Sequence, residues 1–178
     1  MRSILAIVRR LGFGAMAPML MALMLMCHFH TAQAAVPSWN QVANVKDAAQ
    51  RLAKLHRSEG TQGVMKFLEA CYKTHMLASE FTQGLEACMA QDYMHSQVLA
   101  AIYSKVPEAD RVRLKAPSPE LISGTMAKRF EAVFEQYHID KADAEKFKKA
   151  VDQYAFPIFL KAVFQKAGKA DGARKETR

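Results

Sequence analysis

The sequence has little that would build a β-sheet, a cofactor site or a nucleic-acid interface. β-Branched residues are few, and they do not alternate with polar residues over a run that would make a half-buried strand. The 178 residues contain no catalytic motif, cofactor fingerprint or internal repeat that we recognise. No basic patch carries interleaved aromatic residues, so nothing supports binding of DNA or RNA. Helices are therefore the expected fold.

Only one long apolar run is present, and it lies near the start of the chain. Positive charge precedes it, supplied by Arg2, Arg9 and Arg10. The run, residues 11–26, is shorter than the roughly 20 residues that cross a bilayer. Ala32 and Ala34 then offer the small side chains that a signal peptidase reads. We predict that residues 1–34 are a signal peptide cleaved between Ala34 and Ala35, and that the mature protein is periplasmic or secreted.

Other interpretations of this leader fit less well. A retained membrane anchor would need a longer apolar run. The pair Arg9-Arg10 permits a twin-arginine export route, but Leu11 to Phe13 match that signal loosely, and the general secretory route is favoured. A lipid anchor on Cys27 is disfavoured because Met26 is bulky where a small residue is needed.

The mature chain would be one domain with a nearly neutral body. Losing the three leader arginines lowers the formal charge from +8 to +5, and four of these five charges lie from Lys161 onward. A chain of about 144 residues suffices for one core and is short for two. We predict a single helical domain over residues 35–167 and a flexible basic tail over residues 168–178.

Helical periodicity and capping residues divide this domain. We predict helices over residues 39–57, 64–77 and 79–106, a short helical turn over 108–113, and helices opening at 119 and 141. The expected N-caps are Ser38, Ser118 and Asp140. Gly60 and Gly63 bracket the first turn. The expected product is a compact antiparallel bundle of five or six helices.

The apolar face of the last helical stretch changes sides near Pro157. Phe147, Val151 and Tyr154 share one face. The next apolar residues, on nearly the opposite face, are Phe156, Phe159, Leu160 and Val163. We therefore predict two helices that meet at Phe156-Pro157. The last one is most simply a core helix, with weak contact to an anionic membrane surface as the alternative.

Two cysteines remain after the predicted processing, and their spacing indicates a disulfide. The midpoint between Cys71 and Cys88 falls at Ser79 and Glu80, where two helices should turn back. Residues equidistant from such a turn lie level in an antiparallel hairpin, and exported compartments are oxidising. We predict a Cys71–Cys88 disulfide that links the hairpin, with two buried free thiols as the alternative.

A polar cluster interrupts the apolar face of the third helix. Asp92 lies in the middle of that face, beside His95 and Ser96. A buried carboxylate is costly unless it is paired. The simplest interpretation is a structural polar contact from Asp92 to His95 or to an arginine such as Arg129. A serine-type triad is disfavoured, because the imidazole must stand between the hydroxyl and the carboxylate.

A ligand or metal pocket is the alternative for this cluster. If the turns centre on Gly60 and on residues 79–80, His56 and His95 occupy one layer of the bundle, with Asp92 one turn below. Two imidazoles and a carboxylate suit zinc, iron or copper, provided that the first and third helices are neighbours. We commit to no metal and no cofactor.

The sequence thus predicts an all-α exported protein whose biochemical role it does not state. The favoured function is a non-enzymatic accessory module of the cell envelope that acts through contact with another protein. The alternative is a metal- or small-ligand-binding protein that uses His56, Asp92, His95 and Ser96.

Overall fold

The computed structural model describes residues 38–164. The predicted signal peptide, its cleavage site at Ala34 and Ala35, and the predicted basic tail over residues 168–178 lie outside the described residues.

Helices, joined by turns and short loops, are the only regular elements of the described chain, which contains no strand. Its elements are α2 (Gln41–His75), α3 (Gln83–Tyr103), α4 (Glu108–Arg113), α5 (Pro119–Gln136), α6 (Lys141–Ala150) and the π-helical turn η1 (Val151–Ala155). Residues 156–164 continue as α-helix. The all-α prediction is confirmed, and the short turn of helix over residues 108–113 appears with those bounds.

Two predicted N-caps are confirmed by their hydrogen bonds. Ser118 accepts a bond from the backbone N–H of Leu121, with Pro119 in the first turn of α5. Asp140 accepts one from the N–H of Asp143 at the start of α6. Each cap satisfies a backbone donor that the first helical turn leaves without a partner.

The first and third predicted helices begin later than expected. Asn40, rather than Ser38, caps α2 by accepting from the N–H of Ala43. Thr82 caps α3, which therefore begins three to four residues beyond Ser79. Ser38 and Asn40 both make acceptable caps, as do Ser79 and Thr82, so the sequence alone does not select between them.

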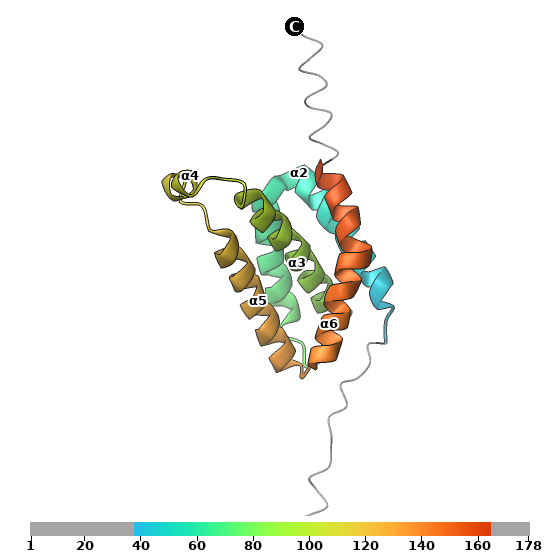
Figure 1. Ribbon diagram of the computed structural model, residues 1–178. Coiled ribbons are helices and arrows are strands. Elements are labelled where there is room, and N and C mark those ends of the chain that lie inside the picture. The colour runs from blue at the N-terminus through green and yellow to red at the C-terminus, as the bar shows by residue number, and fades with distance from the viewer. Residues whose placement is uncertain (1–37, 165–178) are drawn as a thin grey trace, which may run out of the picture. The chain divides into compact units, whose positions relative to one another are not determined.

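The predicted turn near Gly60 is a bend at a single residue. Gly60 has φ 66° and ψ −165°, a backbone conformation that residues with a Cβ rarely adopt. Helical structure continues on both sides of it, and the chain bends sharply there (Figure 1). The two halves of α2 therefore pack against different neighbours: His56 contacts Phe159, and Cys71 contacts α3.

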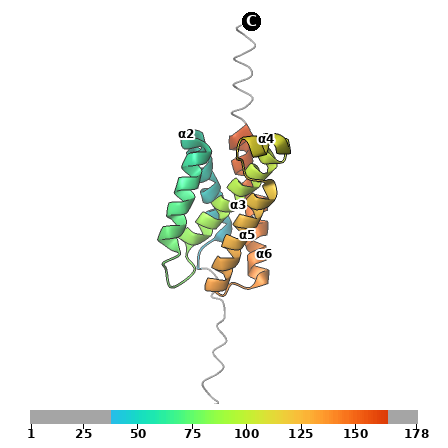
Figure 2. The same ribbon diagram turned by 90° about the vertical axis from the view of Figure 1, so that its left-hand side faces the viewer.

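Helix α3 is the centre of the bundle. It packs against α2, α5 and η1, so it meets neighbours on several sides (Figures 1 and 2). Every residue from Leu85 to Asp92 is buried. A helix enclosed in this way buries its polar as well as its apolar positions.

The predicted break at Phe156-Pro157 is wrong. The chain stays helical through Pro157, and the change of phase occurs one turn earlier, in η1. The N–H of Phe156 donates to the carbonyl of Val151, a wider π-type turn. Proline lacks an N–H and crowds the carbonyl four residues before it, so widening the preceding turn relieves the conflict without a break.

This π-turn keeps one face of the final helix in the core. Val151, Ala155 and Phe159, each four residues after the last, are all fully buried. Phe156, Leu160 and Val163 pack at the edge of the core, whereas Phe164 is 59% exposed. The core-helix interpretation is therefore supported, and contact with a membrane surface stays a prediction. No helix within residues 38–164 is long and apolar enough to cross a bilayer.

The predicted disulfide hairpin is confirmed. Cys71 on α2 and Cys88 on α3 lie at disulfide-bonding distance, with their Cα atoms 5.9 Å apart. The adjoining turn is held by α5, because the Tyr137 hydroxyl lies 3.3 Å from the carbonyl of Met76 and 3.2 Å from that of Ala78. This end of the bundle is fixed by covalent and polar contacts together.

Candidate functional site

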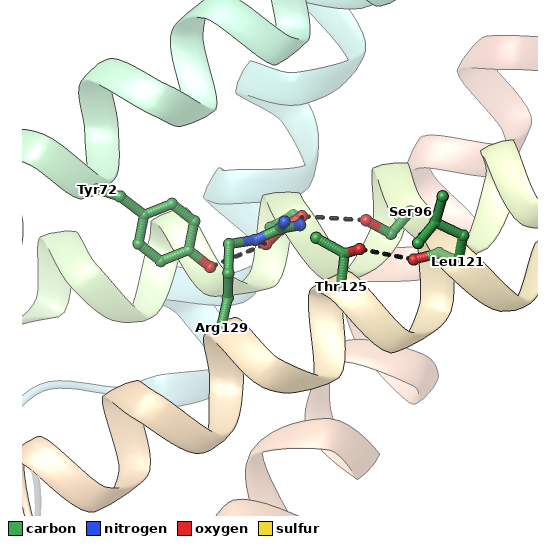
Figure 3. A network of polar contacts seen from close by, with 6 residues as sticks. Tyr72, Ser96, Leu121, Thr125 and Arg129 are labelled. Carbon is green, nitrogen blue, oxygen red and sulfur yellow. Dashed lines mark hydrogen bonds and ion pairs between the residues drawn. The ribbon is translucent and has the colours of Figure 1, made fainter. Parts of the chain in front are cut away.

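The Asp92 carboxylate is the centre of a polar network that joins three helices. Arg129 of α5 binds it with two N–H groups, at 2.8 Å from Nε and 2.7 Å from Nη2. The Tyr72 hydroxyl of α2 and the Ser96 hydroxyl of α3 each donate at 3.0 Å. Figure 3 shows these side chains converging from their helices. The predicted pairing of Asp92 with Arg129 is confirmed, whereas the alternative bond to His95 is not made.

The contacts of this network indicate a structural role. Asp92 is 2% exposed, and four donors satisfy its two oxygens. The bonds to Asp92 raise the pKa of Arg129, so the guanidinium stays charged. Burial, with the Asp92 charge beside it, raises the pKa of the Tyr72 phenol. The network therefore links α2, α3 and α5 through a hydrogen-bonded ion pair.

Ser96 does not form a hydrolytic arrangement with its neighbours. Its hydroxyl donates directly to Asp92, so no imidazole stands between the two groups. The structure thus agrees with the expectation that these residues are not a serine-type triad.

A second buried carboxylate, Glu86, was missed by sequence reasoning. It is fully buried and accepts hydrogen bonds from the side chains of Trp39, Gln41 and Asn44, the last two at 2.6 and 3.0 Å. Glu86 lies about 140° around the helix from the apolar stripe that starts at Phe81, where a solvated face is expected. The enclosure of α3 overrides that pattern. The only sequence signal was the single tryptophan, Trp39. It lies 47 residues before Glu86, and nothing in the sequence shows that the two side chains meet.

His95 is the least satisfied group in the described core. It is 3% exposed, and neither ring nitrogen has a hydrogen-bond partner among the described residues. Burial lowers its pKa to about 4, and the nearby His56 adds to this, while Asp92 opposes it. The imidazole is therefore neutral at pH 7 and presents a lone pair inside the bundle.

The predicted cluster of His56, Asp92 and His95 is brought together in part. Helices α2 and α3 are neighbours, as the site requires, and His56 is close enough to His95 to act on its charge. His56 also meets the ring of Phe159 edge-on, with centroids 5.8 Å apart. The Asp92 oxygens, however, are taken by Arg129, Tyr72 and Ser96. A three-ligand site there stays a prediction.

Another set of potential metal ligands lies at the disulfide. The sulfur atoms of Cys71 and Cys88 and a ring nitrogen of His75 all lie within 4.8 Å of one another. Among residues 38–164 this is the one group of three such ligands so close together. The helical spacing places His75 and Cys71 on one face of the second helix, but the sequence did not indicate that the two cysteines and His75 form one group of ligands.

Comparison with known proteins gives no family for this chain. No protein-family model, no curated protein and no solved structure matches it.

Proposed function

We propose that this protein is an exported, non-enzymatic helical module that acts by contact with another protein. The contact surface is the arm, defined as residues 104–118, which joins α3 to α5 and contains α4. The observation that carries the proposal is that α4 has no buried residue. Figure 1 shows α4 standing away from the helices of the bundle.

Large apolar side chains are exposed on the arm and at its two bases. Val112 is 73% exposed and Leu114 is 61% exposed. Ile102, before the arm, and Leu121, after it, are also exposed. Burying a side chain of this size is worth about 1.5–3 kcal/mol, and the free protein forgoes most of that here. A single exposed apolar side chain is ordinary, but half of the exposed large apolar residues of the described chain fall within residues 102–121, which favours this segment as the interaction site.

The arm is held in place without being covered. The guanidinium of Arg111 donates to the carbonyls of Val106 and Tyr103, at 2.6 and 3.3 Å, and ties α4 to the end of α3. Arg113 pairs with Asp110 across one helical turn. Val112 and Leu114 alternate with these two arginines along the chain, so the exposed apolar side chains are presented on an ordered element.

The charges on the arm select the chemistry of the partner. The arm carries four basic residues against two acidic ones, and the exposed Lys105 and Lys115 make no ion pair with a described residue. A complementary surface is an apolar groove on a protein, bordered by carboxylates. A second copy of this chain and an anionic membrane are the occupants that an experiment must separate from it.

Export is part of the same proposal. The N-terminal charge and apolar run indicate a signal peptide, and a disulfide persists in an oxidising compartment. Intact mass of the protein recovered from a bacterial host should begin at Ala35. Recovery of the uncleaved chain in the membrane fraction would contradict this part of the proposal.

Photo-crosslinking from the arm tests the function. A photoreactive amino acid placed at 112 or 114 should capture one protein in the native compartment, identified by mass spectrometry. The same probe at Met65, which is 58% exposed on α2, is the matched control. Val112→Ser with Leu114→Ser should then lower affinity for the purified partner at least about tenfold, because buried apolar anchors dominate such interfaces. Equal capture from 65 and 112, a dimer adduct or a lipid adduct would each contradict the proposal.

A small-ligand site at His95 is the second candidate. It is favoured by one observation, that both ring nitrogens of a 97%-buried imidazole lack a described partner. Such a group in a folded protein calls for a bound water, ion or ligand. The test is a copper or zinc titration of the unaltered protein beside His95→Gln. Both proteins are kept in the disulfide-bonded form, so that Cys71 and Cys88 offer no thiol to the metal. Equal binding by both proteins would remove this candidate.

A further inference from the structure

We infer that the disulfide end of the bundle is a redox-controlled metal site. When the Cys71–Cys88 bond is reduced, the two thiolates and the His75 imidazole bind one zinc or copper(I) ion. When the bond re-forms, the ion is released. This site is separate from the arm and from His95.

The backbone already places the three ligands for one ion. Cys71 and His75 are one turn apart on α2, and Cys88 faces them from α3. All three ligand atoms lie within 4.8 Å of one another. A tetrahedral ion with metal–sulfur bonds near 2.3 Å and metal–nitrogen bonds near 2.0 Å has ligand atoms roughly 3.5–3.8 Å apart. Once the sulfurs are no longer bonded, separation by this amount and a small movement of the imidazole suffice.

A glycine on the opposing helix makes room for the imidazole. A Cβ added at Gly84 would lie 2.2 Å from Cε1, 2.6 Å from Nδ1 and 2.8 Å from Nε2 of His75. Any other residue at 84 would therefore push the ring away. Gly84 is one helical turn before Cys88, so the ring rests against α3 one turn from the cysteine, with its ring nitrogen still within 4.8 Å of the sulfur atoms. This is a second observation, independent of the cysteines, that the histidine is seated at this point.

The His75 ring is available as a ligand. None of the hydrogen bonds among residues 38–164 uses its nitrogens, and the residue is only partly buried. Thiolate and neutral imidazole are ligands that zinc and copper(I) favour over the oxygen-seeking ions. Three protein ligands leave a fourth position open on a tetrahedral ion, as in exchangeable rather than closed structural sites.

A dithiol reductant supplies the electrons for the switch. Its thiolate attacks the partly exposed sulfur of Cys71, and the sulfur of Cys88, which is fully buried, leaves as a thiolate. The second thiol of the reductant then displaces Cys71, so the reductant becomes a disulfide and the protein gains two thiols. Metal binding releases their protons. Oxidation reverses this, because sulfur atoms bonded to each other cannot both be thiolate ligands.

Cobalt(II) is the probe that tests the site. The purified protein is reduced with a phosphine under anaerobic conditions and titrated with Co²⁺, followed by Zn²⁺ as competitor. We expect a sulfur-to-cobalt charge-transfer band and strong visible bands of a tetrahedral ion in the reduced protein, both removed by Zn²⁺, and neither in the oxidised protein. The absence of the charge-transfer band from the reduced protein would overturn the assignment.

Variants separate the histidine from the thiols. His75→Gln should weaken Co²⁺ binding at least tenfold, and Gly84→Ala should do the same while keeping all three ligands. His138→Gln, an exposed histidine beyond α5, is the matched control and should bind as the unaltered protein does. Circular dichroism of each reduced variant reports the helical fold. Binding by a folded His75→Gln that equals the control would show that His75 is not a ligand.

Discussion

The two ends of the bundle are held by different means. On one side, defined here as the tied end and taken to include the Asp92 network at the middle of α3, the Cys71–Cys88 disulfide, the Glu86 and Asp92 networks and the Tyr137 bonds connect α2, α3 and α5. Beyond them, at the open end, are the bend at Gly60, His95 one turn after Asp92, and the arm, whose helix α4 has no buried residue.

This difference indicates where stability and recognition lie. The two buried carboxylates of the tied end are hydrogen-bonded, so removing their partners should mainly cost stability. The open end carries exposed apolar side chains and an imidazole without a described partner. A bound protein would cover the apolar side chains, and a bound water, ion or ligand would pair with the imidazole. A rigid base with a free surface suits a protein that acts by contact.

The largest loss of stability is expected from breaking the ion pair of the tied end. Arg129→Met leaves the Asp92 carboxylate buried without its cation, which should lower the free energy of unfolding at pH 7 by about 3–4 kcal/mol. Urea denaturation measures it. Lys128→Met, at the exposed neighbouring position, is the control and should cost under about 0.5 kcal/mol. Similar losses for the two variants would show that the network does not hold the tied end.

Removing the disulfide should have the next largest effect. Cys71→Ala with Cys88→Ala opens a loop of 17 residues, and its chain entropy predicts a loss of about 3 kcal/mol. Denaturation of this variant beside the oxidised protein measures the difference. Thiol titration of the denatured, unreduced protein should find no free sulfhydryl among these two residues. A loss below about 1 kcal/mol would mean that noncovalent contacts alone fix the hairpin.

The open end should respond to pH through His95. Its pKa is about 4 in the folded protein and 6.5 in the unfolded chain, so the unfolded state binds the proton more readily. Stability should therefore fall as the pH drops from about 6.5 towards 4 and level off below. Between pH 7.5 and 5 the loss should be about 2 kcal/mol and should be absent from His95→Met. A His95→Met variant with the same pH dependence as the unaltered protein would contradict this.

The smallest stability effect is expected on the arm itself. Val112→Ser with Leu114→Ser should change the free energy of unfolding by less than about 0.5 kcal/mol, because both side chains are already in water. Val133→Ser, at a position that is 1% exposed on α5, is the contrasting control and should cost at least about 2 kcal/mol. A large loss in the arm variant would mean that the arm packs against the bundle in solution.

Local signals predicted most of the fold and part of the polar core. The caps Ser118 and Asp140, the short helix at 108–113 and the disulfide follow from spacing and residue type. Arg129 was foreseen as a partner because a carboxylate at Asp92 needs one. These inferences use residues that are close in the sequence, or the number of residues that separates each cysteine from a turn. Both can be read from the sequence.

Two kinds of feature could not be predicted. One is burial by a helix that is distant in the sequence, and the other is a local change in the number of residues per helical turn. Glu86 lies on the side of α3 opposite the stripe, and only the packing of α2 shows that this side is buried too. At Pro157 a helical wheel assumes a constant 100° per residue, whereas η1 widens one turn and keeps Phe159 in the core. The seating of His75 against Gly84 requires the register of two helices, which no local pattern supplies.

Native-state hydrogen exchange compares the two ends most directly. We predict that amides of residues 85–98 in α3 exchange only with global unfolding, whereas those of 108–114 in α4, an ordered but uncovered helix, exchange through local opening and are far less protected. If α4 were as strongly protected as α3 in the isolated protein, the arm would be part of the packed bundle. It could not then be the free contact surface on which the proposed function depends.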